Sequence, residues 1–319
     1  MYHPDRFQGK NRRRHYFEGW YFKITDLSAE NTLALIPGIS YGDDDSDKHA
    51  FIQVLDAKSD LSQYFQFDAS TFFSSHDSFM ISIEKNLFHS KGMAVSLKND
   101  HAQYYGKLTF REITPFPRTL FSRGIMGPFG WIPFMECHHD ILNIRHTLAG
   151  TLVVNGKEIC FDMGTGYLEK DWGTSFPESW IWLQCNHFKN SKTSFMLSYA
   201  RIPFMGTSFK GLIAFIQTEN SFYKIATYNG AKVTSLDIGK NNLTLIVESK
   251  KHALNISVDI KAGGLLRTPK NGRMVASVLE SMTSEISICL IEKNGKMLIK
   301  EKGIIAGVEL DGDMAGLNP

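Results

Sequence analysis

The sequence lacks the signatures of several protein classes. Its four cysteines are far apart and form no CxxC pair, which argues against a zinc site or a disulfide framework and favours free thiols. No apolar run approaches the roughly 18 residues that span a bilayer. The first twenty residues contain no hydrophobic signal core. From these absences we expect a cytoplasmic protein.

Motifs for common cofactor and hydrolase chemistry are also missing. The chain has no GxGxxG or GxxxxGK[ST] loop, no GxSxG elbow and no HExxH pair. These absences argue against most nucleotide-dependent enzymes, serine hydrolases and zinc proteases. Proton-transfer chemistry has no short signature and stays possible.

The charge balance gives no reason to expect a nucleic-acid partner. Lys and Arg number 35 against 33 Asp and Glu, a net charge of +2. One basic run, residues 10–15, precedes an aromatic segment. We expect it to pair with carboxylates, including those of the acidic segment 43–47, and superficial contact with a membrane stays open.

Aromatic residues are abundant: 23 Phe, 11 Tyr and 5 Trp make up 12% of the chain. Such a composition favours all-β structure, a large apolar pocket, or both. Short β-branched or aromatic segments separated by turn residues predict strands along the whole chain. The predicted strands are 20–24, 32–36, 50–55, 79–84, 93–98, 105–110, 146–154, 157–162, 180–186, 193–200, 212–217, 222–228, 243–249, 254–260, 285–292 and 297–302.

Turn residues predict how these strands connect. Asn-Gly pairs at 155–156, 229–230 and 294–295 each predict a tight type I′ hairpin, and 274–282 is the one predicted short helix. The Gly-, Pro- and Phe-rich segment 113–134 is interpreted as a loop across a pocket mouth or a domain seam. We therefore predict two β domains, 1–134 and 135–319, each a barrel or sandwich.

The segment 180–188 suggests a binding surface. Strand alternation puts Trp180, Trp182, Gln184 and Asn186 on one face of the predicted strand. Buried amides need hydrogen-bond partners, so this face suits a lumen that holds an apolar ligand with one polar end. The alternative is a central strand whose large side chains fill an ordinary core.

Two acidic and two histidine positions could carry chemistry. Glu169 and Asp171 share one face of an extended segment with Lys170 opposed, and paired carboxyls can keep a proton for general-acid catalysis. The alternative is that they are solvated or in salt bridges. His138 and His139 point to opposite faces of a strand, so a single histidine lining a pocket is favoured over metal ligation.

Several segments together resemble the tocopherol cyclase family, including its bacterial cyclase-like members. The resemblance starts at residues 13–23 (RRHYFEGWYFK), is strongest over 169–188 (from EKDWG onward), and continues weakly at 266–269 (LRTP) and 313–315 (DMA). It implies a lipocalin-like, all-β architecture of two β domains and a ligand with an isoprenoid or similar apolar tail. It also implies that no metal or nucleotide cofactor is needed.

In the plant enzymes of this family a double bond is protonated and a phenol then closes a chromanol ring. On that basis the candidate acid is Glu169 or Asp171, with His138 or His139 as substitutes, and Gln184 and Asn186 would orient the ligand hydroxyl. Indole and phenol faces stabilise a desolvated cation by about 2 kcal/mol or more each. The candidate wall consists of Trp20, Tyr167, Trp172, Trp180 and Trp182.

The chain departs from the plant motif at two positions, with Leu168 in place of a serine and Asp171 in place of an asparagine. Three functions are therefore predicted as alternatives. The first is a cyclase or isomerase acting on an amphipathic prenylated molecule. The others are a lipid- or isoprenoid-binding protein without turnover and an isoprenoid hydratase.

Overall fold

A computed structural model describes residues 3–119, 122, 124–132, 135–190, 192–204 and 206–319. These residues form antiparallel β-strands joined by turns and short 3-10 helices, and no α-helix occurs among them. The predicted all-β class is confirmed. Within the same residues, no helix is long and apolar enough to pass through a membrane.

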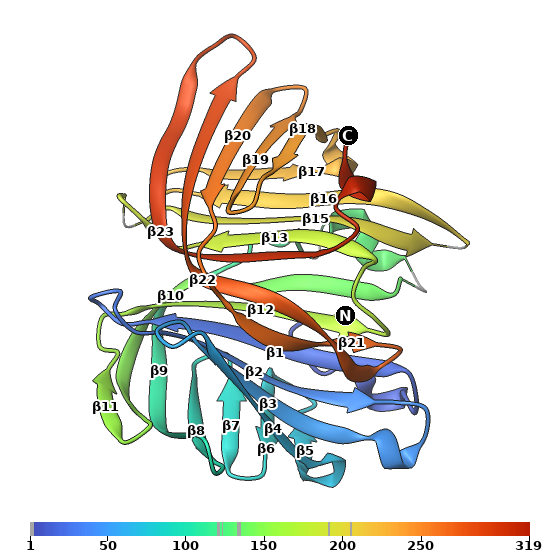
Figure 1. Cartoon of the computed structure of the whole chain (residues 1–319), viewed down its shortest axis with the longest axis vertical. Coiled ribbons are helices and arrows are strands. Elements are labelled where there is room, and N and C mark those ends of the chain that lie inside the picture. Colours follow the sequence, from blue (N-terminus) through green and yellow to red (C-terminus); the bar gives the residue numbers. More distant parts are fainter. Residues whose placement is uncertain (1–2, 120–121, 123, 133–134, 191, 205) are drawn as a thin grey trace. The chain divides into compact units, whose positions relative to one another are not determined.

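The first sheet has twelve strands in the order β4-β3-β2-β1-β12-β10-β9-β8-β7-β6-β5, with β11 paired to β10 (Figure 1). Its strands are β1 Tyr16–Thr25, β2 Thr32–Tyr41, β3 His49–Asp56, β4 Leu61–Asp68, β5 Phe72–Ser74, β6 Met80–Ile83, β7 Asn86–His89, β8 Gly92–Lys98, β9 Gln103–Pro115, β10 Cys137–Val154, β11 Lys157–Cys160 and β12 Thr165–Gly173.

The second sheet has eleven strands in the order β17-β16-β15-β13-β23-β22-β20-β19-β18, with β14 paired to β23 and β21 to β22. Its strands are β13 Ser179–Cys185, β14 His187–Phe188, β15 Ser194–Phe204, β16 Thr207–Gln217, β17 Phe222–Ala226, β18 Lys232–Ile238, β19 Asn242–Glu248, β20 His252–Asp259, β21 Gly264–Lys270, β22 Arg273–Glu292 and β23 Met297–Gly312. The 3-10 helices are η1 Gly9–Asn11, η2 Asp45–Asp47, η3 Ala69–Thr71, η4 Gly127–Trp131, η5 Thr227–Asn229 and η6 Ala315–Leu317.

The chain divides into two compact units that differ from the predicted domains. The first contains Met1–Gly130, Met135–Phe176 and Leu266–Ser277, and the second contains the remainder. The predicted boundary at 134 separates β10 and β12 from the first unit, whereas β12 pairs with β1 and β10 pairs with β9. Of the predicted loop 113–134, the residues 120, 121, 123, 133 and 134 lie outside the described part.

Each unit has its own apolar core, built from alternate residues of its strands. In the first unit Trp20, Phe22 and Leu168 are wholly buried members of the core. In the second unit Ile181 and Leu183 have the same role. Burying an aliphatic or aromatic side chain stabilises the fold by roughly 1.5–3 kcal/mol. The residues that alternate with these, such as Tyr167 and Glu169 on β12 and Trp180 and Trp182 on β13, are members of neither core.

The three Asn-Gly pairs, each predicted to form a type I′ hairpin, adopt three different turn structures. Asn155 and Gly156 have φ values of 51° and 83° between β10 and β11, which confirms the predicted type I′ hairpin. The pair at 294–295 also joins two paired strands, β22 and β23, but only its glycine has positive φ, in a three-residue turn closed by Glu292 and Lys296.

Two local predictions are wrong. Asn229 and Gly230 do not form a hairpin: they end the helix η5, where Gly230 is the left-handed cap, and β17 and β18 pair with other strands. The predicted helix 274–282 is part of strand β22, which pairs with β20, β21 and β23, and Glu280 and Ser281 lie opposite residues of β23. Pairing with two neighbours along the sheet outweighs the weak local preference for helix.

Candidate active site

Three adjacent strands bring the distant sequence motifs together. β12 lies between β1 and β10 (Figure 1), so the EKDWG segment is flanked on both sides. In the register, Tyr21 of β1 is opposite Glu169, and His139 of β10 is opposite Asp171. Residues directly opposite on antiparallel strands point to the same face of a sheet. These four side chains therefore share one face.

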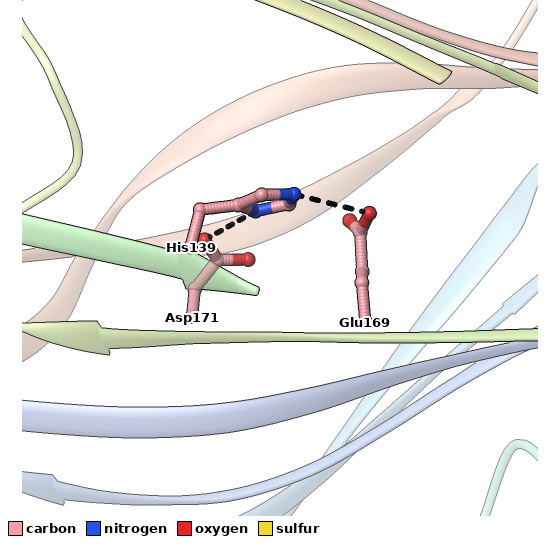
Figure 2. A group of neighbouring side chains, drawn as sticks. All are labelled: His139, Glu169 and Asp171. Atoms are coloured by element: carbon pink, nitrogen blue, oxygen red, sulfur yellow. Dashed lines mark hydrogen bonds and ion pairs between the residues drawn. The ribbon is translucent and has the colours of Figure 1, made fainter. Parts of the chain in front are cut away.

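A hydrogen-bonded cluster forms on this face. His139 lies between two carboxylates that both come from β12 (Figure 2). Its Nδ1 is 2.9 Å from Asp171 Oδ1 and its Nε2 is 3.6 Å from Glu169 Oε2. The Tyr167 hydroxyl donates a hydrogen bond of 2.6 Å to the same Glu169 oxygen. We call Tyr167, Glu169, Asp171 and His139 the histidine–carboxylate cluster.

The cluster is shielded from water, which strengthens its electrostatics. The side chains of Glu169, His139 and Asp171 are 6%, 13% and 21% exposed. Burial alone would lower the pKa of His139, but the charges of Asp171 and Glu169 and the hydrogen bond to Asp171 raise it to about 9. Burial and the charge of Glu169 raise the pKa of Tyr167 well above its ordinary value. At neutral pH the buried imidazole of His139 is therefore protonated, and the Tyr167 phenol beside it is neutral.

The loop that follows β9 covers the outer edge of β10 next to His139. Here β10 has not yet paired with β9, since that pairing begins at Asn143. The Arg118 guanidinium donates to the Ile141 carbonyl over 3.3 Å, and the His139 amide lies 3.1 Å from Met126 Sδ. This part of the predicted apolar loop thus lies against the strand that carries His139.

The donor atoms of the cluster could also hold a cation. One ligand atom each from His139, Glu169 and Asp171 lies within 4.8 Å of the others. Imidazole and carboxylate donors of this kind suit divalent transition metals. The His139 Nδ1 lies 2.9 Å from Asp171 Oδ1 and Tyr167 donates to a Glu169 oxygen, whereas the His139 Nε2 has no hydrogen-bond partner among the described residues. The expectation of a cofactor-free site stays a prediction.

Three of the predicted site residues lie on the opposite face of the first sheet. The Lys170 ammonium is 4.9 Å from the ring centre of Trp20 and 4.6 Å from that of Trp172. The His138 ring stacks on Trp172 at 5.3 Å between centroids, and burial and nearby cations lower its pKa. The two adjacent histidines therefore face opposite ways, as predicted. The structure does not bring Trp20, Trp172 or His138 to the cluster.

The remaining predicted residues belong to the second unit: Trp180, Trp182 and Gln184 lie on the face of β13 that points away from its core, and Asn186 directly follows the strand. Trp180, Trp182, Gln184 and Asn186 are all buried, and none of them is a member of either apolar core. The Trp180 indole donates to Glu309 Oε2 over 2.8 Å, and the Gln184 amide donates to Asn186 over 3.1 Å. The predicted alternation of β13 is confirmed.

Glu309 was not among the predicted residues. It lies 129 positions from Trp180 in the sequence and belongs to β23. No local pattern distinguishes it from Glu301 and Asp311, the other acidic residues of the same strand, which are partly buried as it is. Only the pairing of β13 with β23 brings the two side chains together.

A family model described as tocopherol cyclase-like matches residues 107–312, more than half of the chain and the whole of β10, β12, β13 and β23. The chain belongs to the tocopherol cyclase-like family. It is 28% identical over 199 residues to a probable chloroplastic tocopherol cyclase of Oryza sativa subsp. japonica, a match of 57% of this chain and 42% of that protein. It is 27% identical over 198 residues to the chloroplastic tocopherol cyclase of Zea mays, covering 57% and 41%. The match spans about two fifths of either plant protein.

Solved structures share the fold of this tocopherol cyclase-like chain at low sequence identity. A putative AttH of Nitrosomonas europaea has a TM-score of 0.58 and 12% identity, covering 98% of this chain and 97% of that one. CghA in complex with Sch210972 has a TM-score of 0.58 and 8% identity, covering 93% and 89%. Kievitone hydratase of Nectria haematococca has a TM-score of 0.52 and 12% identity, covering 98% and 93%.

Proposed function

We propose that this tocopherol cyclase-like protein is a cofactor-independent cyclase that protonates a double bond of a prenylated phenol. The observation that carries the proposal is the buried imidazole of His139, held between Asp171 and Glu169 with Tyr167 bound to Glu169. A buried proton held between fixed groups is what general-acid catalysis requires. The ligand class comes from the family to which the chain belongs.

Each group has a separate task in this proposal. Asp171 accepts the Nδ1 proton of His139 and fixes the orientation of the ring. The Nε2 proton then points to Glu169, so the proton available to a ligand is the one held between His139 and Glu169. Tyr167 donates to Glu169 and fixes the position of that carboxyl group.

The reaction is neutral overall. The shared proton adds to the less substituted carbon of the double bond and leaves a tertiary carbocation. The phenol oxygen attacks this cation and forms the new C–O bond. The phenolic proton leaves to the His139–Glu169 pair, which restores its starting state. Since no electron or group is transferred to the protein, no co-reactant is required.

The decisive experiment uses a dimethylhydroquinone that carries a prenyl chain. The purified protein is incubated with this probe, and products are separated by chromatography and identified by mass spectrometry and NMR. We expect a cyclised isomer from the wild type, none from Glu169→Gln, and unchanged turnover from the exposed control Glu248→Gln. A product heavier by one water would instead identify a hydratase.

Binding must be measured on the same samples, because it distinguishes an enzyme from a carrier. Glu169→Gln preserves size and hydrogen bonding, so the probe should bind to it within about threefold of wild type by calorimetry. Binding without turnover in the wild type would favour the isoprenoid-binding protein. Full turnover in Glu169→Gln would refute the role proposed for this carboxyl group.

A further inference from the structure

The spacing of His139 and Glu169 fits two ligands of one metal ion (Figure 2). The Nε2 atom of His139 lies 3.6 Å from Oε2 of Glu169. A tetrahedral zinc ion holds nitrogen and oxygen ligands at about 2.0–2.2 Å, which places two such ligands about 3.4 Å from one another. An ion between these two side chains therefore requires almost no movement of either one.

The Nε2 atom of His139 is also available as a ligand. It is buried and has no hydrogen-bond partner among the described residues. A buried polar atom without a partner costs free energy. The other ring nitrogen, Nδ1, lies 2.9 Å from Oδ1 of Asp171. A histidine that binds a metal commonly donates its second N–H group to a carboxylate, which fixes the tautomer and directs the remaining lone pair to the metal, so the contact with Asp171 prepares the ring as a ligand.

We propose that His139 Nε2 and the Glu169 carboxylate bind Zn²⁺, and that the bound ion inhibits the reaction by replacing the catalytic proton. Binding releases the Nε2 proton to the solvent and changes no oxidation state. Asp171 holds the ring in place, and water completes the coordination of the ion. The inhibition rests on the proposed function, whereas the metal site itself does not.

The chemistry of the donors favours a transition metal over Mg²⁺ or Ca²⁺. Imidazole nitrogen suits zinc, copper and nickel, whereas Mg²⁺ and Ca²⁺ take oxygen ligands. Asp171 adds a second carboxylate, and one donor atom from each of the three residues lies within 4.8 Å of the others. Carboxylates that are shielded from water attract a divalent cation more strongly than the same groups at a surface. All three residues belong to the first unit, so the site is complete within it.

The test measures Zn²⁺ binding to the full chain by calorimetry, in the absence of any organic ligand. Removing a carboxylate that holds a ligating histidine typically weakens metal binding about 10- to 100-fold, and we expect this loss for Asp171→Asn. Glu169→Gln keeps the size of the side chain and removes a direct anionic ligand, so it should weaken Zn²⁺ binding at least as much. His139→Gln removes the nitrogen ligand and should abolish the site.

The exposed pair of His15 and Asp43 provides a matched control, because its atoms are similarly spaced but are not buried. The His15 Nδ1 atom lies 3.4 Å from Asp43 Oδ1, and the two side chains are 52% and 56% exposed. His15→Gln should therefore change the Zn²⁺ affinity of the buried site less than about threefold. An excess of Mg²⁺ should not displace the bound Zn²⁺. If His139→Gln fails to fold, the isosteric variants Glu169→Gln and Asp171→Asn provide the same comparison.

Zn²⁺ that saturates the site should abolish turnover of the prenylated probe, and a chelator should restore it. Three results would overturn the proposal: the wild type does not bind Zn²⁺, or Glu169→Gln and Asp171→Asn bind it like the wild type and it is an adventitious ion only, or bound Zn²⁺ leaves turnover undiminished. A wild type that turns over the probe but binds no Zn²⁺ would refute the metal site alone. A wild type that binds Zn²⁺ through His139 but never turns over the probe would refute the proposed function and leave the metal site in place.

Discussion

Glu18 and Lys170, which come from two separate sequence motifs, form an ion pair of 2.5 Å with both side chains completely buried. Glu18 also accepts hydrogen bonds from the Tyr16 hydroxyl and from the amides of Gln8 and Gly9. These contacts tie the segment before β1 to the first sheet. Lys170, which lies between Glu169 and Asp171 in the EKDWG motif, therefore has a structural role through Glu18. The two acidic residues on either side of it face His139 instead.

Breaking this pair should destabilise the protein strongly. Burial lowers the pKa of Lys170 and raises that of Glu18, so each charge depends on the other. Removing one partner from a buried pair typically costs about 3–5 kcal/mol, and we expect this loss for Lys170→Met in urea unfolding. The exposed pair of Lys293 and Glu248 provides the control, since Lys293→Met should cost less than about 1 kcal/mol. Equal losses in the two variants would contradict a buried, coupled pair.

The elevated pKa of His139 predicts a pH limit at the site. The folded-state pKa of about 9 exceeds the ordinary 6.5, so the imidazolium is fully formed below 6.5 and is lost as the pH rises through about 9. Both turnover and the stabilisation from this group should fall in that window. NMR titration of the His139 ring nitrogens measures the pKa directly. In Asp171→Asn, which removes the largest of the charges that raise it, the midpoint should move down by at least one unit.

Turnover that persists undiminished above pH 10 would contradict a proton held by His139. An unchanged His139 midpoint in Asp171→Asn would show that Asp171 does not set the charge of the ring. The exposed pair of Lys261 and Asp259 allows a matched control, because Asp259→Asn removes a carboxylate at the surface. This variant should leave the His139 midpoint within about 0.3 units of wild type.

Tyr167→Phe tests the hydrogen bond that positions Glu169. The variant keeps the buried ring and removes only the hydroxyl, which lies 2.6 Å from Glu169 Oε2. A hydrogen bond to a charged group contributes about 1.5–3 kcal/mol, so kcat should fall by about 10- to 100-fold while KM stays within about threefold. If instead KM rose by about 10- to 100-fold while kcat stayed unchanged, Tyr167 would act in ligand binding, which is the role that the sequence predicted. Tyr105→Phe, which alters a hydroxyl on β9 away from the cluster, is the matched control.

The sequence predicted the strands and the faces better than the assembly of the sheets. Period-two alternation correctly placed Glu169 with Asp171 and opposed Lys170, and it separated His138 from His139. It could not show that β12 pairs with β1 rather than with β13, so the domain boundary was misplaced and Trp20 was grouped with residues of the other face. Glu309 was missed for the same reason, since its neighbours come from β13 and β22.

His146 predicts a second pH effect, at the acid end. Its ring is completely buried in the first unit, 4.0 Å from that of Phe110, and neither ring nitrogen has a hydrogen-bond partner among the described residues. Burial lowers its pKa to about 3, so between pH 6.5 and 3 the unfolded chain binds a proton that the folded chain does not. The free energy of unfolding therefore has its full value above pH 6.5 as far as His146 is concerned, and it falls by about 1.4 kcal/mol for each pH unit between 6.5 and 3. In urea unfolding between pH 7 and 4, His146→Leu should lose less stability than the wild type, whereas the exposed control His101→Gln should follow the wild type. If His146→Leu and the wild type showed the same slope, the buried ring would not be the group that titrates.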